Sequence, residues 1–290
     1  MLPARAVLIS LSLAALLGPA QVRAQYQQPW VGRGVPAQQA TGHDQVLVAQ
    51  RSTAPAPAVR RKAAAAPTAV AATRFTIRIE NISKGEVLKL SNGKTAPFVS
   101  APVLWVIHEG SANPIFVGGK LDPGLGLEIL AEMGNPSQLA KSLTGQRGTT
   151  TVGADAKPVG GESEGPIPPG QKYEFEIEAR PGQTLSTAWM FGQSNDLFYS
   201  NDRPIALFDA AGKPVSGDMT AQLSLWDAGT EVNEEPGSGP NQGPRQKTPD
   251  AGVRERQGIS HVRDRFNYPR TVDVLRMTIT ASGDAMSARR

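Results

Sequence analysis

The 290-residue chain contains no cysteine and only three histidines. The lack of cysteine excludes disulfides, thiolate zinc sites, iron–sulfur clusters and cysteine nucleophiles. The histidines, His43, His108 and His261, lie far apart in the sequence, so we expect no metal site built from several of them. The phosphate-binding sequence G-x-x-x-x-G-K-[ST] is also missing, and Gly124-Leu-Gly126 lacks the third glycine of a dinucleotide-binding turn. Several common classes of catalytic and cofactor site are therefore excluded.

No apolar run in the sequence reaches the roughly 20 residues that cross a bilayer. Residues 6–17 form an apolar run of 12 residues after Arg5, and Val22-Arg23-Ala24 places small residues at the −3 and −1 positions of a cleavage site. These three features together are typical of a secretory signal peptide. We expect a signal peptide over residues 1–24, no transmembrane span after its removal, and a secreted or periplasmic protein.

The next segment is rich in a few residue types and has no sustained hydrophobic period. Residues 25–73 contain 13 Ala, 7 Gln and 5 Pro. Such a segment cannot bury enough apolar area to offset the chain entropy lost on folding. We expect a disordered tether over residues 25–73, a folded domain over 74–281 and a disordered tail over 282–290.

The formal net charge of +4 is concentrated in the N-terminal part of the chain. Residues 1–73 contain seven Lys or Arg and one Asp, whereas residues 74–290 carry a net charge of −2. Nucleic-acid-binding domains gather positive charge on their folded surface. The mildly acidic domain therefore argues against nucleic acid as a partner.

The hydrophobic pattern of the domain predicts strands. Residues 74–80 and 173–178 alternate apolar and polar side chains, as half-buried strands do. Residues 102–107 form an almost continuous apolar run, which is typical of a strand covered on both faces. Three further strands are predicted at residues 185–191, 219–226 and 275–279.

One segment has a helical pattern instead. Residues 125–143 place leucines at helical spacing and are interrupted by Gly134-Asn135-Pro136, which predicts one or two short helices on a connection. Residues 144–170 and 231–252 are rich in Gly and Pro, and we expect them to be loops. Many strands, long loops and little helix predict an all-β fold, an antiparallel β-sandwich.

Acidic and amide side chains follow two of the predicted strands. Asp196 comes directly after one strand, and Asp227 and Glu231 lie four residues apart after another, around Gly229. Calcium binds six to eight oxygens from carboxylates, carbonyls and water, and flexible loops suit it. If the two strands end at the same pole, Asp196 and Asp227 could share one cation. Asp, Asn and Gly also form turns without any metal, so a metal site and plain turns both stay open.

Three segments resemble the spondin N-terminal domain, the domain of F-spondin and mindin that also occurs alone in secreted bacterial proteins. They are Met190-Phe-Gly-Gln-Ser-Asn-Asp196-Leu-Phe198, Trp226-Asp227-Ala-Gly-Thr-Glu231 and Phe266-Asn-Tyr268-Pro269. The resemblance covers about residues 74–281 and implies a C2-like β-sandwich with one Ca²⁺ at one end. The cysteines and the thrombospondin-type and reelin-type domains of the animal members are absent, so their adhesion and immune-recognition roles are not carried over.

The resemblance also implies the metal ligands. They are Asp196, Asp227, the acidic residue four positions later, Glu231, and a glutamate on the preceding acidic strand. Glu178 fits the last position, and Glu176 has the same strand parity and is the alternative. The family usually has Asp where Glu231 stands, and the longer glutamate side chain reaches about one methylene further.

Two classes of function follow from these observations. The leading hypothesis is a non-enzymatic binding or adhesion module in which calcium holds the loops at one end, with a protein or glycan of the cell envelope or the exterior as partner. A purely structural envelope protein would differ only in its partner. The alternative is an exported hydrolase that acts on a glycan or phosphoester through a metal or carboxylate cluster, with His108 and His261 as candidate acid–base groups.

Overall fold

The computed structural model describes residues 71–282. The predicted signal peptide, most of the predicted tether and residues 283–290 lie outside the described residues. The first strand, β1 (Thr73–Asn81), begins one residue before the expected start of the folded domain. No helix in the described part of the chain combines the length and the apolar character that crossing a membrane would require.

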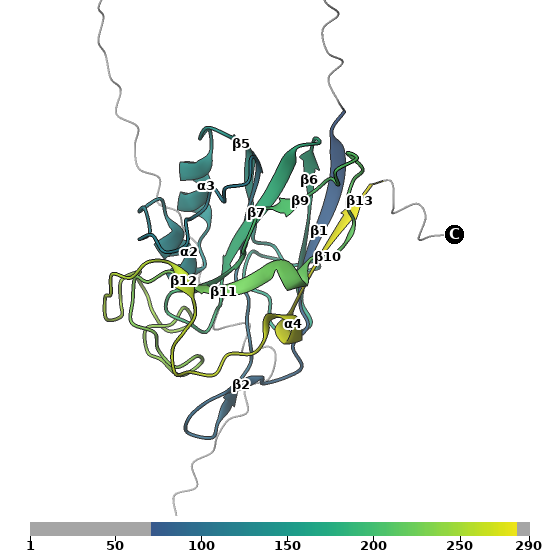
Figure 1. The fold of residues 1–290 in the computed structure, drawn as a ribbon. Coiled ribbons are helices and arrows are strands. Elements are labelled where there is room, and N and C mark those ends of the chain that lie inside the picture. The colour runs from purple at the N-terminus through teal and green to yellow at the C-terminus, as the bar shows by residue number, and fades with distance from the viewer. Residues whose placement is uncertain (1–70, 283–290) are drawn as a thin grey trace, which may run out of the picture. The chain divides into compact units, whose positions relative to one another are not determined.

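Two antiparallel sheets packed face to face form the domain (Figure 1), which is the predicted all-β sandwich. The first sheet has the order β10 (Gly217–Asp218), β13 (Leu275–Ala281), β1 and β6 (Lys172–Ala179). The second has the order β12 (Ser260–His261), β11 (Leu223–Asp227), β8 (Leu197–Asn201), β7 (Gln183–Met190), β4 (Val103–Glu109) and β5 (Thr149–Asp155), with β9 (Ile205–Ala206) paired to β7. A separate hairpin joins β2 (Leu88–Lys89) and β3 (Thr95–Ala96).

The first sheet shows why alternation predicted its strands. The inward side chains of β1, Phe75, Ile77 and Ile79, are completely buried between the sheets. Each such side chain contributes about 1.5–3 kcal/mol relative to an exposed position. Most of the outward side chains are charged and pair across strands, as Arg78 does with Glu174 on β6. This sheet therefore buries one face and leaves the other in solvent.

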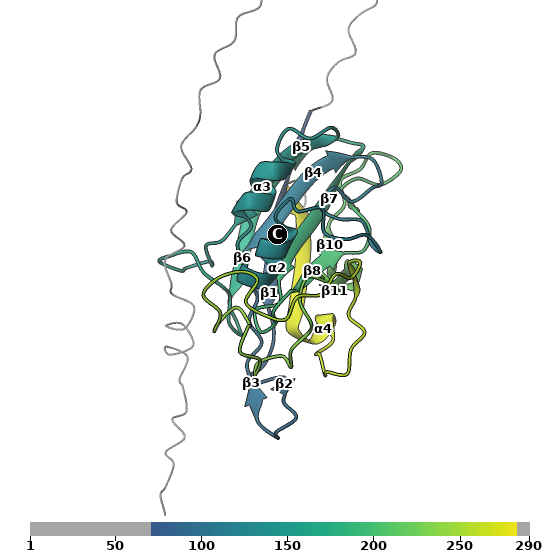
Figure 2. The ribbon, with the colours of Figure 1, turned by 90° about the vertical axis from the view of Figure 1, so that its left-hand side faces the viewer.

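Two short helices cover the outer face of the second sheet, and Figure 2 views the domain from their side. They are α2 (Leu127–Met133) and α3 (Ser137–Leu143), separated at the predicted break. Gly134 ends α2 in a left-handed conformation, with φ of 65°. Leucines from both helices pack on Leu104 and Val106 of β4 and form a second core. Strand β4 is thus covered on both faces, as its continuous apolar run predicted.

Four parts of the structure differ from the predicted secondary structure. Residues 144–170, expected to be a loop, contain β5, a largely polar edge strand whose sequence has little hydrophobic pattern. The segment expected to be a strand from residue 219 begins as a single 3₁₀ turn, η1 (Thr220–Gln222), and becomes extended only at Leu223. Strand β8 was not predicted, and a short helix, α4 (Thr271–Val274), precedes β13.

Candidate metal centre at one end of the sandwich

Strand pairing brings Asp196 and Asp227 together. Asp196 directly precedes β8, and Asp227 is the last residue of the antiparallel neighbour β11, where it pairs with Leu197. The first residue of one strand and the last residue of its antiparallel partner lie at the same end of a sheet. The N–H of Ala228 also donates to the carbonyl of Asp196 at 3.2 Å. The two strands therefore end at the same pole, which was the condition for Asp196 and Asp227 to share one cation.

Asp196 is completely buried and is only partly satisfied by hydrogen bonds. Its Oδ2 accepts hydrogen bonds from the N–H of Thr230 at 3.0 Å, the hydroxyl of Thr230 at 3.2 Å and the N–H of Glu231 at 3.0 Å. Its Oδ1 is inaccessible to solvent and has no hydrogen-bond partner within residues 71–282. Burial, and then the charge of Asp227, raise the pKa of Asp196 well above its usual value. A bare carboxylate oxygen beside a second carboxylate is what a bound cation would satisfy.

Asp227 is held in a tight turn at the end of β11. Its Oδ1 accepts a hydrogen bond from the N–H of Gly229 at 2.7 Å, and its Oδ2 accepts one from the amide of Asn233 at 2.6 Å. Gly229 has a φ of 69°, and a Cβ atom at this position would lie 2.5 Å from the carbonyl oxygen of Gln257. Only glycine fits this turn, because the conformation is left-handed and the space is filled. Burial raises the pKa of Asp227 above its usual value.

Glu231 is also completely buried in this end of the sandwich. Its Oε1 accepts a hydrogen bond from the N–H of Gly252 at 2.7 Å, and its Oε2 accepts one from the amide of Asn195 at 3.3 Å. Burial is the main cause that raises the pKa of Glu231. Glu231 thus lies with the two aspartates in the same loop cluster, although each of its carboxylate oxygens already has a protein donor.

Glu178 and its alternative Glu176 lie elsewhere. Both side chains point outward from β6 in the first sheet, are more than half exposed, and pair with Arg74 at 3.3 and 3.5 Å. Glu178 precedes β7, whereas Asp196 follows it, and eight extended residues span roughly 25 Å. The structure therefore does not bring either glutamate to Asp196. Because side chains alternate along a strand, both glutamates point to the solvent face of β6. There they form ion pairs with Arg74 of β1.

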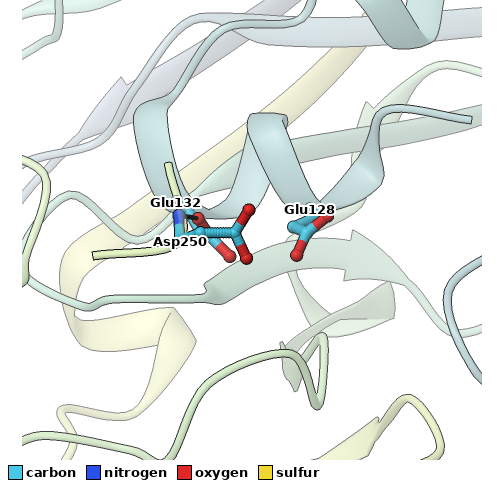
Figure 3. Close-up of side chains that lie close together, drawn as sticks. All are labelled: Glu128, Glu132 and Asp250. Atoms are coloured by element: carbon cyan, nitrogen blue, oxygen red, sulfur yellow. Dashed lines mark hydrogen bonds between the residues drawn. The ribbon is translucent and has the colours of Figure 1, made fainter. Parts of the chain in front are cut away.

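Figure 3 shows a second carboxylate cluster, Glu128, Glu132 and Asp250, which the sequence did not indicate. The hydroxyl of Thr230 places it next to Asp196. One carboxylate oxygen from each of Glu128, Glu132 and Asp250 lies within 4.8 Å of the others, so this cluster could hold a metal ion. Among residues 71–282, no other three acidic or histidine side chains meet as closely. Arg254 forms an ion pair with Asp250 at the exposed side of the cluster. The predicted set of Asp196, Asp227 and Glu231 is more widely spaced than this.

The two clusters are joined by one hydroxyl group. Glu132 is completely buried on α2, and burial raises its pKa to about 7. The hydroxyl of Thr230 lies 3.2 Å from Oε1 of Glu132 and 3.2 Å from Oδ2 of Asp196. A hydroxyl has a single proton to donate, so it cannot serve both carboxylates fully. The charge of Glu231 further raises the pKa of Glu132. This end of the domain therefore concentrates buried negative charge.

The sequence held a weak signal for the second cluster. Glu128 and Glu132 are four residues apart and share one face of α2, and Glu132 falls on the apolar stripe of that helix. A glutamate on the buried stripe indicates a specific partner, because burying a lone carboxylate is costly. Nothing in the sequence links this helix to Asp250, which follows more than a hundred residues later.

The two histidines considered for hydrolysis, His108 and His261, lie in different surroundings. His108 is buried on β4, and its Nε2 lies 2.9 Å from the hydroxyl of Ser186, which is itself completely buried. His261 stacks on Trp226 with ring centroids 4.0 Å apart and lies 3.8 Å from Asp202 at the surface. Histidines in general acid–base catalysis must reach a substrate, and His108 does not reach the surface.

A serine-hydrolase sequence pattern is also present but has the wrong structural context. Residues 161–165 read Gly-Glu-Ser-Glu-Gly and match G-x-S-x-G. The nucleophile elbow of that pattern requires a sharp turn from a strand into a helix. Ser163 instead lies exposed on the loop between β5 and β6, both of which are strands. The match is therefore coincidental.

Comparison with known proteins provides no further assignment, since no family model and no curated protein matches the chain. The segments of residues 190–198, 226–231 and 266–269 lie close together in the structure. Asp196 and Asp227 meet at the edge of the second sheet, and the ring of Tyr268 contacts Phe191 with centroids 6.1 Å apart.

Proposed function

We propose that the chain is a secreted β-sandwich that binds Ca²⁺ at its acidic end and acts as a non-enzymatic binding module. The observation that carries this proposal is the completely buried carboxylate of Asp196, which lies beside Asp227 and whose Oδ1 has no hydrogen-bond partner within residues 71–282. The completely buried carboxylate of Asp196 and the partly buried carboxylate of Asp227 repel each other, and a divalent cation would remove that repulsion. The convergence of the three spondin-like segments supports the same interpretation.

Calcium fits the groups at this end better than a transition metal does. The candidate ligands are carboxylate, amide and main-chain oxygens, which hard cations prefer. The chain has no cysteine, and its one described surface histidine near β11, His261, is engaged with Trp226. The loop that follows Asp227 is long and glycine-containing, and calcium tolerates the irregular geometry that such a loop provides.

The ion has two candidate positions, and the proposal places it at Asp196 and Asp227. The cluster of Glu128, Glu132 and Asp250 is the second position, since its three carboxylates lie closest together. Bound calcium would join the turn after β7 to the loop after β11. It would thereby order the loop surface that a protein or glycan partner contacts.

The experiment is a thermal melt of the full chain in excess EGTA and in excess calcium. A ligand at about 100 times its dissociation constant adds about 2.7 kcal/mol to the free energy of unfolding. For a domain of this size, that shift corresponds to a few degrees in Tm. We expect calcium to raise Tm, and magnesium at the same concentration to raise it less.

Matched variants locate the ion. Asp227→Asn removes a candidate ligand, and Asp209→Asn is its control, because Asp209 makes comparable turn hydrogen bonds at 2.9 and 2.8 Å on an exposed hairpin. We expect the calcium response to disappear in Asp227→Asn and to persist in Asp209→Asn. Loss of the response in Glu128→Gln with retention in Asp227→Asn would move the ion to the second position. A metal-free protein without any calcium response would refute calcium binding.

A further inference from the structure

A cavity of about 770 Å³ opens beside the candidate metal centre. Three segments surround it: the β2–β3 hairpin, the loop of residues 233–240 and the segment of residues 265–267. Its volume lies in the range of small-molecule sites, about 300–1,000 Å³. It touches neither histidine considered above, and neither of the acidic clusters lines it.

Two of the three segments around the cavity, the hairpin and the loop of residues 233–240, are hydrogen-bonded to each other without a ligand. Glu235 accepts a hydrogen bond from the N–H of Ser91 on the hairpin at 2.6 Å, and another from the hydroxyl of Ser238 at 2.7 Å. The N–H of Gly237 donates to the carbonyl of Gln193 at 3.2 Å, which ties the loop to the turn after β7. A preformed site loses less conformational entropy on binding than one that must be ordered.

The charged groups of the cavity differ in what they have left to offer. Glu234 accepts hydrogen bonds from both the main-chain N–H and the side-chain amide of Asn241, at 3.0 and 2.7 Å. Its two oxygens can accept further hydrogen bonds from a ligand, but they have none to donate. The side chains of Lys89 and Arg265, which line the cavity, form no ion pair and no hydrogen bond with any residue of the described chain. Arg265 lies over the ring of Phe266, 5.3 Å from its centroid.

These groups together describe one kind of ligand. Two free cations favour an anionic group, and the planar guanidinium of Arg265 suits a carboxylate. The glutamates would repel a purely anionic ligand, yet they are good acceptors for hydroxyl groups. Phe266 offers an apolar surface in the same cavity. A sugar ring that carries a carboxylate presents all three features: an anion, several hydroxyls and an apolar C–H face.

We propose that this cavity binds an acidic saccharide, with Arg265 and Lys89 on the carboxylate, Phe266 against the sugar ring, and Glu234 and Glu235 accepting hydroxyl hydrogens. The inference rests on the proposed function in that it names the ligand of the binding module. The two sites are also adjacent, because Asn233 lines the cavity and its amide donates to Asp227 at 2.6 Å. The cavity itself requires no metal ion.

The test is calorimetric titration of the full chain with trigalacturonate, in EGTA and again with calcium. Maltotriose, a neutral trisaccharide, and tricarballylate, a carboxylate without a sugar, are the comparison ligands. We expect trigalacturonate to bind in EGTA, and both comparison ligands to bind at least about tenfold more weakly, since a charge-assisted hydrogen bond is lost in one case and the ring contacts in the other.

Arg265→Gln should weaken trigalacturonate binding at least about tenfold. Arg270→Gln is the control, because Arg270 is exposed nearby but outside the cavity and is paired with Asp273 at 2.8 Å. Equal binding of maltotriose or tricarballylate, or an Arg265→Gln variant that binds normally, would overturn the inference. The calcium melt of the same sample reports separately on the metal site. Saccharide binding without a calcium response would therefore refute only the calcium proposal, and the reverse result would refute only this one.

Discussion

The main-chain N–H of Asp250 donates a 2.7 Å hydrogen bond to Oε2 of Glu132, across 118 positions of sequence. This bond attaches the long loop after β11 to helix α2 and helps to hold a carboxylate in the protein interior. Glu132 is completely buried, and burial raises its pKa to about 7. The charge of Glu231 also raises the pKa of Glu132. Ionisation of Glu132 at neutral pH therefore destabilises the acidic end of the domain.

The raised pKa of Glu132 predicts a pH-dependent stability in EGTA. The folded protein keeps the Glu132 proton up to about pH 7, whereas the unfolded chain releases it near its ordinary value of 4.5. The folded state therefore binds more protons in this window, and this group's contribution to stability falls as pH rises through it. Glu132→Gln should flatten that part of the slope, and Glu176→Gln, on the exposed face of β6, should leave it unchanged. Urea unfolding at about pH 5, 6, 7 and 8 measures both slopes.

Buried His108 predicts that stability changes with pH in the opposite direction. Burial lowers its pKa below the ordinary value of 6.5. The unfolded chain therefore takes up a proton below about pH 6.5 that the folded protein resists, and stability is lost as pH falls through that region. His108→Gln keeps a polar group facing Ser186 and should remove this loss. The exposed His261→Gln variant is the control. An unchanged low-pH slope in His108→Gln would contradict the assignment.

The β-sandwich could be predicted from the sequence because the alternation of apolar and polar residues in a strand is visible within a few neighbouring residues. Phe75, Ile77 and Ile79 alternate with polar residues, and that pattern alone fixes which face of β1 is buried. Strand β5 escaped prediction because an edge strand needs few apolar side chains, and its pairing with β4 is set by position in the sheet. Local pattern thus identifies core strands better than edges.

Part of the candidate site could likewise be predicted from local sequence pattern, and part could not. Asp196 and Asp227 were predictable because each directly flanks a strand, and strand ends gather at the poles of a sandwich. Glu178 is also acidic, but its side chain points to the solvent face of β6. There it pairs with Arg74 of the neighbouring strand β1. The cluster around Glu132 joins a helix to a distant loop, and the contacts between such elements depend on the folded topology rather than on any local spacing.

Asp196→Asn should have opposite effects in the two metal conditions. Three donors surround Oδ2, so the amide oxygen of the variant takes that position and the NH₂ group faces Asp227. Repulsion between the two side chains disappears, and we expect a higher Tm than wild type in EGTA. The calcium response should be lost, which leaves a lower Tm than wild type in calcium.

Glu178→Gln is the matched comparison for that variant, since Glu178 was expected from sequence to share the same ion. Its partner Arg74 is exposed, and exposed ion pairs contribute about 0–1 kcal/mol. We expect a nearly unchanged Tm and a full calcium response. Loss of the response in Glu178→Gln would mean that β6 and the acidic end meet in the calcium-bound protein.

The turn at Gly229 provides a test of how far the loop conformation matters to the metal centre. Gly229 and Gly212 both have left-handed φ angles, 69° and 76°, but a Cβ atom at Gly212 meets nothing within 4 Å. Gly212→Ala should therefore cost only the conformational penalty of about 1–2 kcal/mol. Gly229→Ala adds a clash with Gln257 and should cost about 1–3 kcal/mol more. Because Gly229 also donates to Asp227, its variant should bind calcium more weakly, and chemical unfolding with and without calcium measures both effects. Equal stability of the two alanine variants would show that the loop yields to the added methyl group and does not constrain Asp227.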